Sequence, residues 1–231
     1  MQVADAYTAG SLYERVARML RAPDVGRVLD VGCADGVLSR ALPRPGPFLV
    51  GLDTSPVLLR SHPPPVVRGD VARLPFVTGA FDAVTALNVL YHLPSPLPAL
   101  REACRVLRDG GYLLVSAIAR DDSPELAGYW RRPATTFDAE DAPAMLAQVF
   151  ADVTVQPWDA PLVTLPSPAA IRDYLLGRQA PAEAADAAAH ALPVPLRVTK
   201  RGALLVARRP AAEGRGPTGV QDDESGASPF S

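Results

Sequence analysis

The stretch Val28-Leu-Asp-Val-Gly-Cys-Ala-Asp-Gly-Val37 decides the fold predicted for this chain. The apolar run over residues 27–31 predicts a strand, which leads through a glycine-bearing turn into a predicted helix that begins at Val37. In open α/β sheets, ligands bind at such turns, outside the carboxyl ends of the strands. Gly32 and Gly36 let the backbone turn tightly and leave no Cβ in the way of a ligand. Taken alone, the stretch also fits a plain strand–helix turn.

Short apolar runs and helical patterns alternate outward from this stretch. Further strands are predicted over residues 48–52, 66–68, 81–87, 112–116, 153–155 and 202–208, and helices over residues 37–42, 55–60, 97–107 and 137–150. Such alternation predicts a parallel sheet with right-handed crossovers, whose strands are buried on both faces.

Polar side chains follow three more of these strands. Asp53 ends the second predicted strand, 21 residues after the first glycine of the quoted turn. A carboxylate at that place can accept hydrogen bonds from both ribose hydroxyls of a nucleoside. Asp70 follows the third strand, and Asn88 and His92 follow the fourth. The alternative for the region after the second strand is a helix cap, a role that Ser55 fits.

Composition excludes several classes of protein. The chain of 231 residues has a net charge of −2 and 48% apolar residues, which predicts a globular protein without the basic surface that nucleic acid needs. No apolar run reaches the roughly 18 residues of a membrane span, and the first residues do not resemble a signal peptide. The two cysteines, Cys33 and Cys104, provide neither a disulfide framework nor zinc-ligand spacing. We therefore expect a cytoplasmic protein that holds no metal.

One domain is predicted over residues 1–210. A disordered tail follows at residues 211–231, because its Gly, Pro, Ser and acidic residues cannot build a core. Residues 7–22 predict an N-terminal helix that covers the site. Residues 159–194 do not fit the alternation and predict a lid insertion, because they carry more apolar side chains than a solvated loop needs. The alternative is that these side chains pad the edge of the sheet.

In order and spacing, these motifs resemble class I S-adenosylmethionine-dependent methyltransferases, in the ubiquinone/menaquinone-biosynthesis-like (type 11) subgroup. The resemblance covers about residues 10–118 and includes the segment 100–111, which is common in the family before the fifth strand. The family usually has three glycines in the first loop, whereas Ala34 stands at the middle position here; we expect this change to be tolerated. The resemblance implies an α/β, Rossmann-like, doubly wound sheet of seven strands, mostly parallel with an antiparallel last strand, and helices on both faces.

The resemblance also implies S-adenosyl-L-methionine as the cofactor. Its implied binding positions are Asp30, Gly32, Cys33, Ala34, Gly36, Asp53, Thr54, Asp70, Val71 and Asn88. Residues 32–36 would lie along the methionine part, Asp53 would bind the ribose hydroxyls and Asp70 would accept from the adenine amine. Asp30 would orient the first loop, and Asn88 would present its backbone carbonyl to the methionine end.

Transfer of the methyl group is an in-line displacement, so the main task of the protein is positioning. His92 is the candidate base, needed only if the acceptor must lose a proton; its alternative is a structural residue beside a helix start. Tyr7, Tyr13 and Tyr174 are candidates for contact with the acceptor. His62, which precedes three prolines, is assigned to a surface loop.

The acceptor is expected to be small and partly apolar, and the sequence does not separate O-, N- and C-methylation. Two other functions stay open. A dinucleotide-dependent oxidoreductase is disfavoured, because the spacing of Gly32 and Gly36 departs from the dinucleotide fingerprint. The other is a non-catalytic protein that binds S-adenosylmethionine and regulates a partner.

Overall fold

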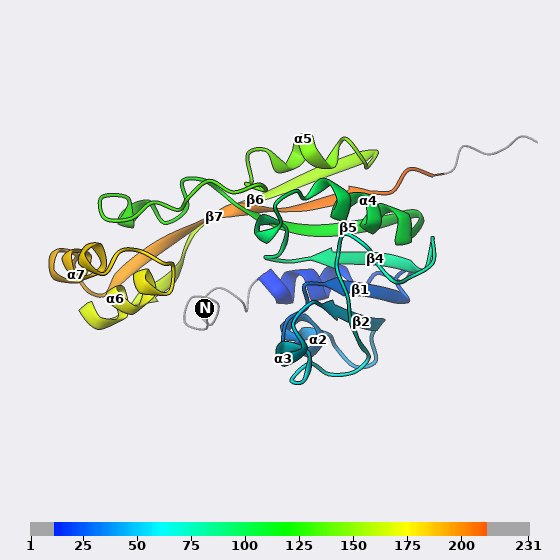
Figure 1. Ribbon diagram of the computed structural model, residues 1–231, viewed down its shortest axis with the longest axis horizontal. Helices are drawn as coiled ribbons and strands as arrows, with labels where there is room; N and C mark the ends of the chain where they lie inside the picture. Colours follow the sequence, from blue (N-terminus) through cyan, green and yellow to red (C-terminus); the bar gives the residue numbers. More distant parts are fainter. Residues whose placement is uncertain (1–11, 212–231) are drawn as a thin grey trace, which may run out of the picture.

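Seven strands form one mixed sheet across residues 12–211, the part of the chain that the computed structural model describes (Figure 1). The strands are β1 (Arg27–Val31), β2 (Phe48–Asp53), β3 (Val66–Arg68), β4 (Phe81–Ala86), β5 (Leu107–Ile118), β6 (Asp152–Leu165) and β7 (Leu196–Arg208). Their order is β3-β2-β1-β4-β5-β7-β6. Strands β1 to β5 pair in parallel, and β7 is antiparallel to both of its neighbours. The predicted fold class is therefore confirmed, including its antiparallel last strand.

Helices cover both faces of this sheet. They span residues 12–19, α2 (Val37–Ala41), α3 (Pro56–Leu59), α4 (Leu97–Val106), α5 (Ala142–Leu146), α6 (Pro168–Leu176) and α7 (Ala182–Ala191), with 3-10 turns η1 (Leu90–His92) and η2 (Pro124–Leu126). Among the described helices, none is long and apolar enough to cross a membrane.

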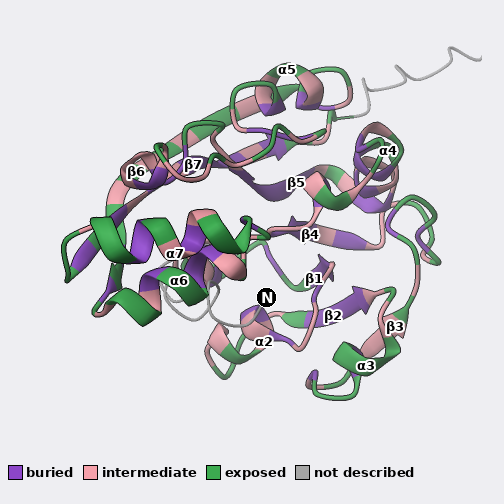
Figure 2. Cartoon of the chain, turned by 60° about the vertical axis from the view of Figure 1, so that its left-hand side comes forward, coloured by how far each residue is buried: buried purple, intermediate pink, exposed green. Residues whose placement is uncertain are grey.

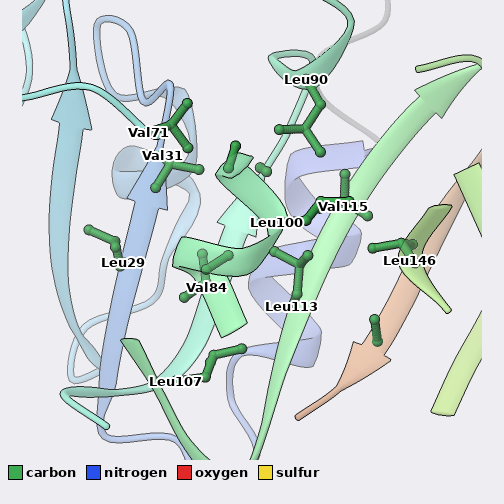
Figure 3. Close-up of a cluster of buried hydrophobic side chains, with 14 of the residues drawn as sticks. Leu29, Val31, Val71, Val84, Leu90, Leu100, Leu107, Leu113, Val115 and Leu146 are labelled. Carbon is green, nitrogen blue, oxygen red and sulfur yellow. The ribbon is translucent and has the colours of Figure 1, made fainter. Parts of the chain in front are cut away.

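The core divides between the two faces because successive strand residues point to opposite sides. Leu113 of β5 packs with Leu29, Val84 and Leu100 on the face that α4 covers (Figure 3). Leu114, the next residue, belongs to the cluster on the other face, under the helix over residues 12–19 and α2. Strands buried on both faces read as continuous apolar runs, and these central strands were therefore placed correctly from the sequence.

The two strands at the end of the sheet are much longer than predicted. Strands β6 and β7 pair from Asp152–Arg208 to Leu165–Leu196, whereas β5 pairs with β7 only as far as Gly202. Beyond that point the two strands continue alone as a ribbon, which we define as residues 159–165 and 196–201. The first seven residues of the predicted lid segment are therefore strand.

The predicted helix over residues 137–150 was also wrong in extent, since α5 spans only five residues, Ala142–Leu146. The preceding chain is turned by Asp138, whose carboxylate is fully buried and accepts hydrogen bonds from Arg132 and Thr135. These bonds replace the first turn of the predicted helix.

Helices α6 and α7 form a cap on the ribbon, beside the carboxyl ends of the central strands (Figure 2). The two helices and the ribbon share a separate hydrophobic cluster, in which Tyr174 and Leu175 are fully buried. Helix α6 begins at Ser167, whose hydroxyl accepts the amide of Ala170 at 3.2 Å, a stabilising N-cap.

We expect Leu175→Ala to lower the free energy of unfolding by about 2–5 kcal/mol, because Leu175 is fully buried in this cluster. Leu162→Ala, on the ribbon beside this cap, should lower the free energy of unfolding much less, because Leu162 is 39% exposed. Urea denaturation of the two variants measures the difference. Equal effects would show that the cap is not a packed core.

Candidate cofactor and acceptor site

The loop that follows β1 has three residues in the left-handed region of backbone space, with φ values of 67° at Gly32, 49° at Ala34 and 93° at Gly36. A Cβ on Gly32 would lie 2.7 Å from the Cβ of Val89 and closer still to its Cγ2. The loop after β4 therefore packs directly on the loop after β1. Ala34 adopts a conformation that costs a non-glycine residue roughly 1–2 kcal/mol, which explains why the family usually has glycine there.

His62 packs on the other side of the same loop. It is 6% exposed, and a Cβ on Gly36 would lie 2.8 Å from its Cδ2. The assignment of His62 to a surface loop was therefore wrong. The segment after α3 folds back against Gly36, so His62 fills the space that the glycine leaves.

Hydrogen bonds join the first loop to the end of β2. The amides of Gly32 and Cys33 donate to the carbonyl of Leu52 at 2.8 and 3.1 Å. The carboxylate of Asp53 accepts the amides of Ala34 at 3.0 Å and Ser55 at 2.8 Å. A carboxylate offers about four acceptor positions, so the half-buried Asp53 keeps capacity for two hydroxyl donors.

Two buried groups lie behind the loop. Asp30 is 4% exposed, and its carboxyl accepts the hydroxyl of Thr85 at 2.6 Å. Burial raises the pKa of Asp30 to about 7; the hydrogen bond from Thr85 opposes this shift and the charge of Asp53 adds to it. Burial, followed by the charges of Asp30 and Asp53, also raises the pKa of the Cys33 thiol. The thiol of Cys33 therefore stays protonated and packs in the loop rather than acting as a nucleophile.

The residues after β3 continue the same edge. Asp53 of β2 lies opposite Arg68 of β3 in the strand register, and the amide of Gly69 donates to the carbonyl of Asp53 at 3.1 Å. Asp70, the next residue, is exposed and uses one oxygen to accept the amide of Ala72 at 2.9 Å.

The two neighbours of these acids have different surroundings. Thr54 is exposed, and its carbonyl accepts from Arg68 at 3.1 Å. Val71 is 7% exposed and packs in the main core, so its side chain is not available to a ligand.

The loop after β4 carries the remaining predicted residues. Asn88 has a φ of 57°, and its amide donates to the hydroxyl of Ser116 on β5 at 2.8 Å. Tyr91 and His92 follow on η1, with their ring centres 4.4 Å apart. The hydroxyl of Thr136 donates to the carbonyl of Leu93 at 2.6 Å and fixes the end of this turn.

A cavity of about 670 Å³ opens beyond Asn88, between the edge of the sheet and the cap. Its apolar and neutral wall includes Leu12, Tyr91, Ile118, Trp130, Pro133, Trp158, Ala160 and Leu162. The predicted residues Tyr13, Asn88 and His92 also line it, whereas the other cofactor positions lie along the edge towards β3.

The structure places one other predicted contact elsewhere. Tyr174 does not line the cavity: helix α6 turns its ring into the cluster under the cap. Tyr7 lies outside the described residues. Trp130, Arg132 and Lys200, which line the cavity, were missed because no local motif marks them. The available signal was that Lys200 is the single lysine of the chain. Within residues 12–211, no cluster of side chains suits a metal ion.

Comparison with known proteins agrees with this geometry. A family model described as a methyltransferase domain matches residues 29–115. A ubiquinone biosynthesis O-methyltransferase of Xanthomonas oryzae is 36% identical over 104 residues, which cover 41% of this chain and 44% of that protein. The chain spans less than half the length of the curated relatives it matches.

Solved structures show the same fold over most of the chain. The YcgJ protein of Bacillus subtilis has a TM-score of 0.63 and 17% identity, with 86% of this chain and 97% of that chain covered. The cyclase SpnF has a TM-score of 0.60 and 21% identity, with 87% and 81% covered.

Together, the fold and the match define a class I S-adenosylmethionine-dependent methyltransferase domain. Within that class, residues 29–115 are similar to the ubiquinone/menaquinone-biosynthesis-like (type 11) subgroup, whose cofactor is S-adenosylmethionine. The match contains every predicted cofactor residue, from Asp30 to Asn88. It ends before the ribbon and the cap, which build the far side of the cavity.

We expect Gly32→Ala to weaken binding of S-adenosylhomocysteine and to lower stability, because the new Cβ would overlap Val89. The left-handed backbone alone should cost at least about 1–2 kcal/mol. Gly128→Ala is the matched control, since nothing lies within 4 Å of a Cβ there. Thermal unfolding and calorimetric titration measure both effects. Equal results for the two variants would contradict the packing of the loops.

Asp30→Asn should remove a pH dependence of stability. The pKa of Asp30 is raised from 3.8 to about 7, so the native state holds an extra proton between these values and loses stability as the pH rises through them. The amide oxygen can still accept from Thr85. Denaturation of both proteins across this window should show the variant gaining stability relative to the wild type as the pH rises. A constant difference would mean that Asp30 ionises alike in both states.

Proposed function

We propose that this protein transfers a methyl group from S-adenosylmethionine to a small-molecule acceptor. The observation that carries this proposal is the meeting of two features at Asn88: the polar edge that follows β1 to β4, and the cavity of about 670 Å³. The cavity has the volume of a small-molecule site, and its mixture of aromatic and polar groups is typical of one. A cytoplasmic location and an acceptor other than nucleic acid stay predictions from composition.

The residues along the edge fit the cofactor. The carboxylate of Asp53 accepts two backbone amides and can still accept two more hydrogen bonds. A pair of ribose hydroxyls needs such free acceptor positions. Asp70 is exposed, with only one oxygen engaged by the backbone. The loop over residues 32–36 turns left-handed three times, and Val89 and His62 pack where a Cβ would stand at Gly32 and Gly36. When bound, the cofactor supplies a methyl group that its sulfonium already activates.

The protein's own contribution is positioning, together with the removal of a proton where the acceptor needs it. His92 is the proposed base. Its side chain is exposed, lines the cavity and stacks on Tyr91, next to the point where Asn88 joins the cofactor edge. Tyr13 lies across the cavity on the helix over residues 12–19, where it fits the role of an acceptor contact.

An O-methyltransferase name among the relatives and the cavity volume both support a small acceptor. A cyclase shares the fold, so binding and turnover need separate tests. Incubation with S-adenosylmethionine and metabolite extracts should add a methyl group to an acceptor, detected by mass spectrometry. Tight binding of S-adenosylmethionine without any methylated product would favour the non-catalytic alternative.

We expect Asp53→Ala to weaken binding of S-adenosylhomocysteine by roughly 1.5–3 kcal/mol, the range for hydrogen bonds to a charged group. Asp70→Asn should lose less, since its amide oxygen still accepts a hydrogen bond. Asp152→Ala is a control at the opposite edge of the sheet, where the acid is exposed. Calorimetry compares the three. Unchanged affinity in Asp53→Ala, or tighter binding of a nicotinamide dinucleotide by the wild type, would overturn the cofactor assignment.

A further inference from the structure

The cavity is strongly cationic for a protein with a net charge of −2. Six cationic side chains line it: Arg15, Arg18, Arg132, Arg178, Lys200 and Arg201. Asp122 is the one carboxylate among its lining residues within the described part of the chain. Such an excess attracts anions, and its effect is strongest where the walls exclude water.

Three of these cations are already neutralised. Lys200 forms a buried ion pair with Asp122. Arg132 lies 2.6 Å from the buried carboxylate of Asp138. The ion pairs of Arg201 are with Asp121 at 2.6 Å and Asp159 at 3.2 Å. These three side chains have little charge left to offer to a ligand.

Arg15 and Arg18 lie on the helix over residues 12–19. Arg15 donates to the side chain of Gln156 at 2.6 Å, and Arg18 is exposed to solvent, which screens its charge. Both belong to this helix rather than to the cap or the ribbon, and they add to the field of the cavity.

Arg178 and Arg201 each have a buried nitrogen without a hydrogen-bond partner among residues 12–211, Nη1 of Arg178 and Nε of Arg201. Arg201 is held by two ion pairs, whereas no carboxylate in that range forms an ion pair with Arg178. A buried donor that lacks a partner costs free energy, and the cost is larger when the group is charged. The side chain of Arg178 also lines the cavity, where an anionic ligand group would pair with its guanidinium.

The fold holds Arg178 in place. Its guanidinium carbon lies 3.8 Å from the centre of the Tyr174 ring, which is fully buried in the cap. The chain turns sharply here: Gln179 has a φ of 61°, and the amide of Ala180 donates back to the carbonyl of Leu175 at 3.1 Å. Tyr174 therefore serves the cavity as a support for Arg178 rather than as its wall.

Lys200 and Arg178 both line the cavity, and their charges interact. Burial is the largest cause that lowers the pKa of Lys200 to about 8, and the positive charge of Arg178 lowers it further, against the attraction of Asp122. The guanidinium of Arg178 is therefore close enough to act on the ammonium group. Since Asp122 balances Lys200, about one positive charge remains here.

We infer that the acceptor is an organic acid whose carboxylate is bound by Arg178 at the ribbon end of the cavity. Its apolar body lies between Trp130, Trp158 and Leu162, and its methyl-accepting atom points towards Asn88. One unbalanced charge matches a carboxylate better than a phosphate dianion. This inference rests on the proposed function for the direction of the acceptor, but not for the binding of the acid.

The two tryptophans of the chain, Trp130 and Trp158, both line the cavity, so their fluorescence reports on its occupancy. The probes are 3-phenylpropionate, its neutral amide 3-phenylpropanamide, and phenyl phosphate, each titrated with and without S-adenosylhomocysteine. In the wild type, the acid should bind about tenfold or more tightly than the amide, as expected for a hydrogen-bonded charge. Added salt should weaken binding of the acid but not of the amide.

Arg178→Gln should abolish the preference for the acid and leave binding of the amide within about twofold, because only the charge contact is lost. Arg178→Lys keeps the charge without the planar stacking group and should fall between. Arg197→Gln, exposed on the same ribbon and outside the cavity lining, should retain the preference.

The inference is overturned if the wild type binds acid and amide equally, if the acid fails to bind at millimolar concentrations, or if Arg178→Gln keeps the preference. It is also overturned, in favour of a phosphorylated acceptor, if phenyl phosphate binds more tightly than the acid. Calorimetry with S-adenosylhomocysteine decides the proposed function separately. A protein that prefers the acid but does not bind S-adenosylhomocysteine would refute that function and leave the acid site standing.

Discussion

The contact of Gly32 with Val89 is the constraint on which the rest of the site depends. Strand β1 lies between β2 and β4, so the loop after it must fit between the loops that follow both neighbours. The absence of a Cβ at Gly32 lets the loop after β4 close over it, and two amides of the same loop are fixed to the carbonyl of Leu52 at the end of β2. This closure fixes Asn88 beside the polar edge. It therefore sets the place where the cofactor positions end and the cavity begins.

Ala34 shows how the loop tolerates a departure from the pattern of its family. The residue adopts a left-handed backbone at a cost, yet its amide donates to Asp53 at 3.0 Å. A hydrogen bond to a charged group is stronger than one between neutral groups, so it offsets much of the strain. The same bond orients the carboxylate before any ligand arrives. Alanine restricts the unfolded chain more than glycine does, but at a positive φ the strain outweighs that gain. The hydrogen bond to Asp53 then helps to hold the loop in one conformation.

The central half of the fold and the polar edge could be predicted from the sequence because their signals are local. Strands β1, β2, β4 and β5 are largely buried and read as apolar runs, and the polar residues lie at or just after the ends of their strands. The ribbon has no such signal: β6 contains Pro157 and Pro161 and is exposed along much of its length, so only its long-range pairing with β7 defines it.

The surplus of apolar side chains around Tyr174 was recognised, but the surface that buries it is the alanine face of α7, which composition does not mark as a core. Lys200 and Arg178 could not be assigned, since the cavity that joins them exists only once the ribbon and cap are folded.

The division of the chain into a matched and an unmatched part has a physical counterpart in the cavity. Residues 29–115 hold the cofactor edge, which any acceptor must meet, whereas the ribbon, the cap and the loop with Trp130 and Arg132 build the opposite wall. That wall buries ionised groups, which is costly unless each is paired. Asp122 illustrates how the cost is met, because it accepts from Lys200, from the hydroxyl of Ser123 and from the amide of Arg201. Lys200, Arg132 and Arg201 are paired with carboxylates inside the protein, so Arg178 is the cation of this wall that keeps its charge for a ligand. It lies outside the matched residues, so the charge preference of the cavity is set separately from the cofactor edge.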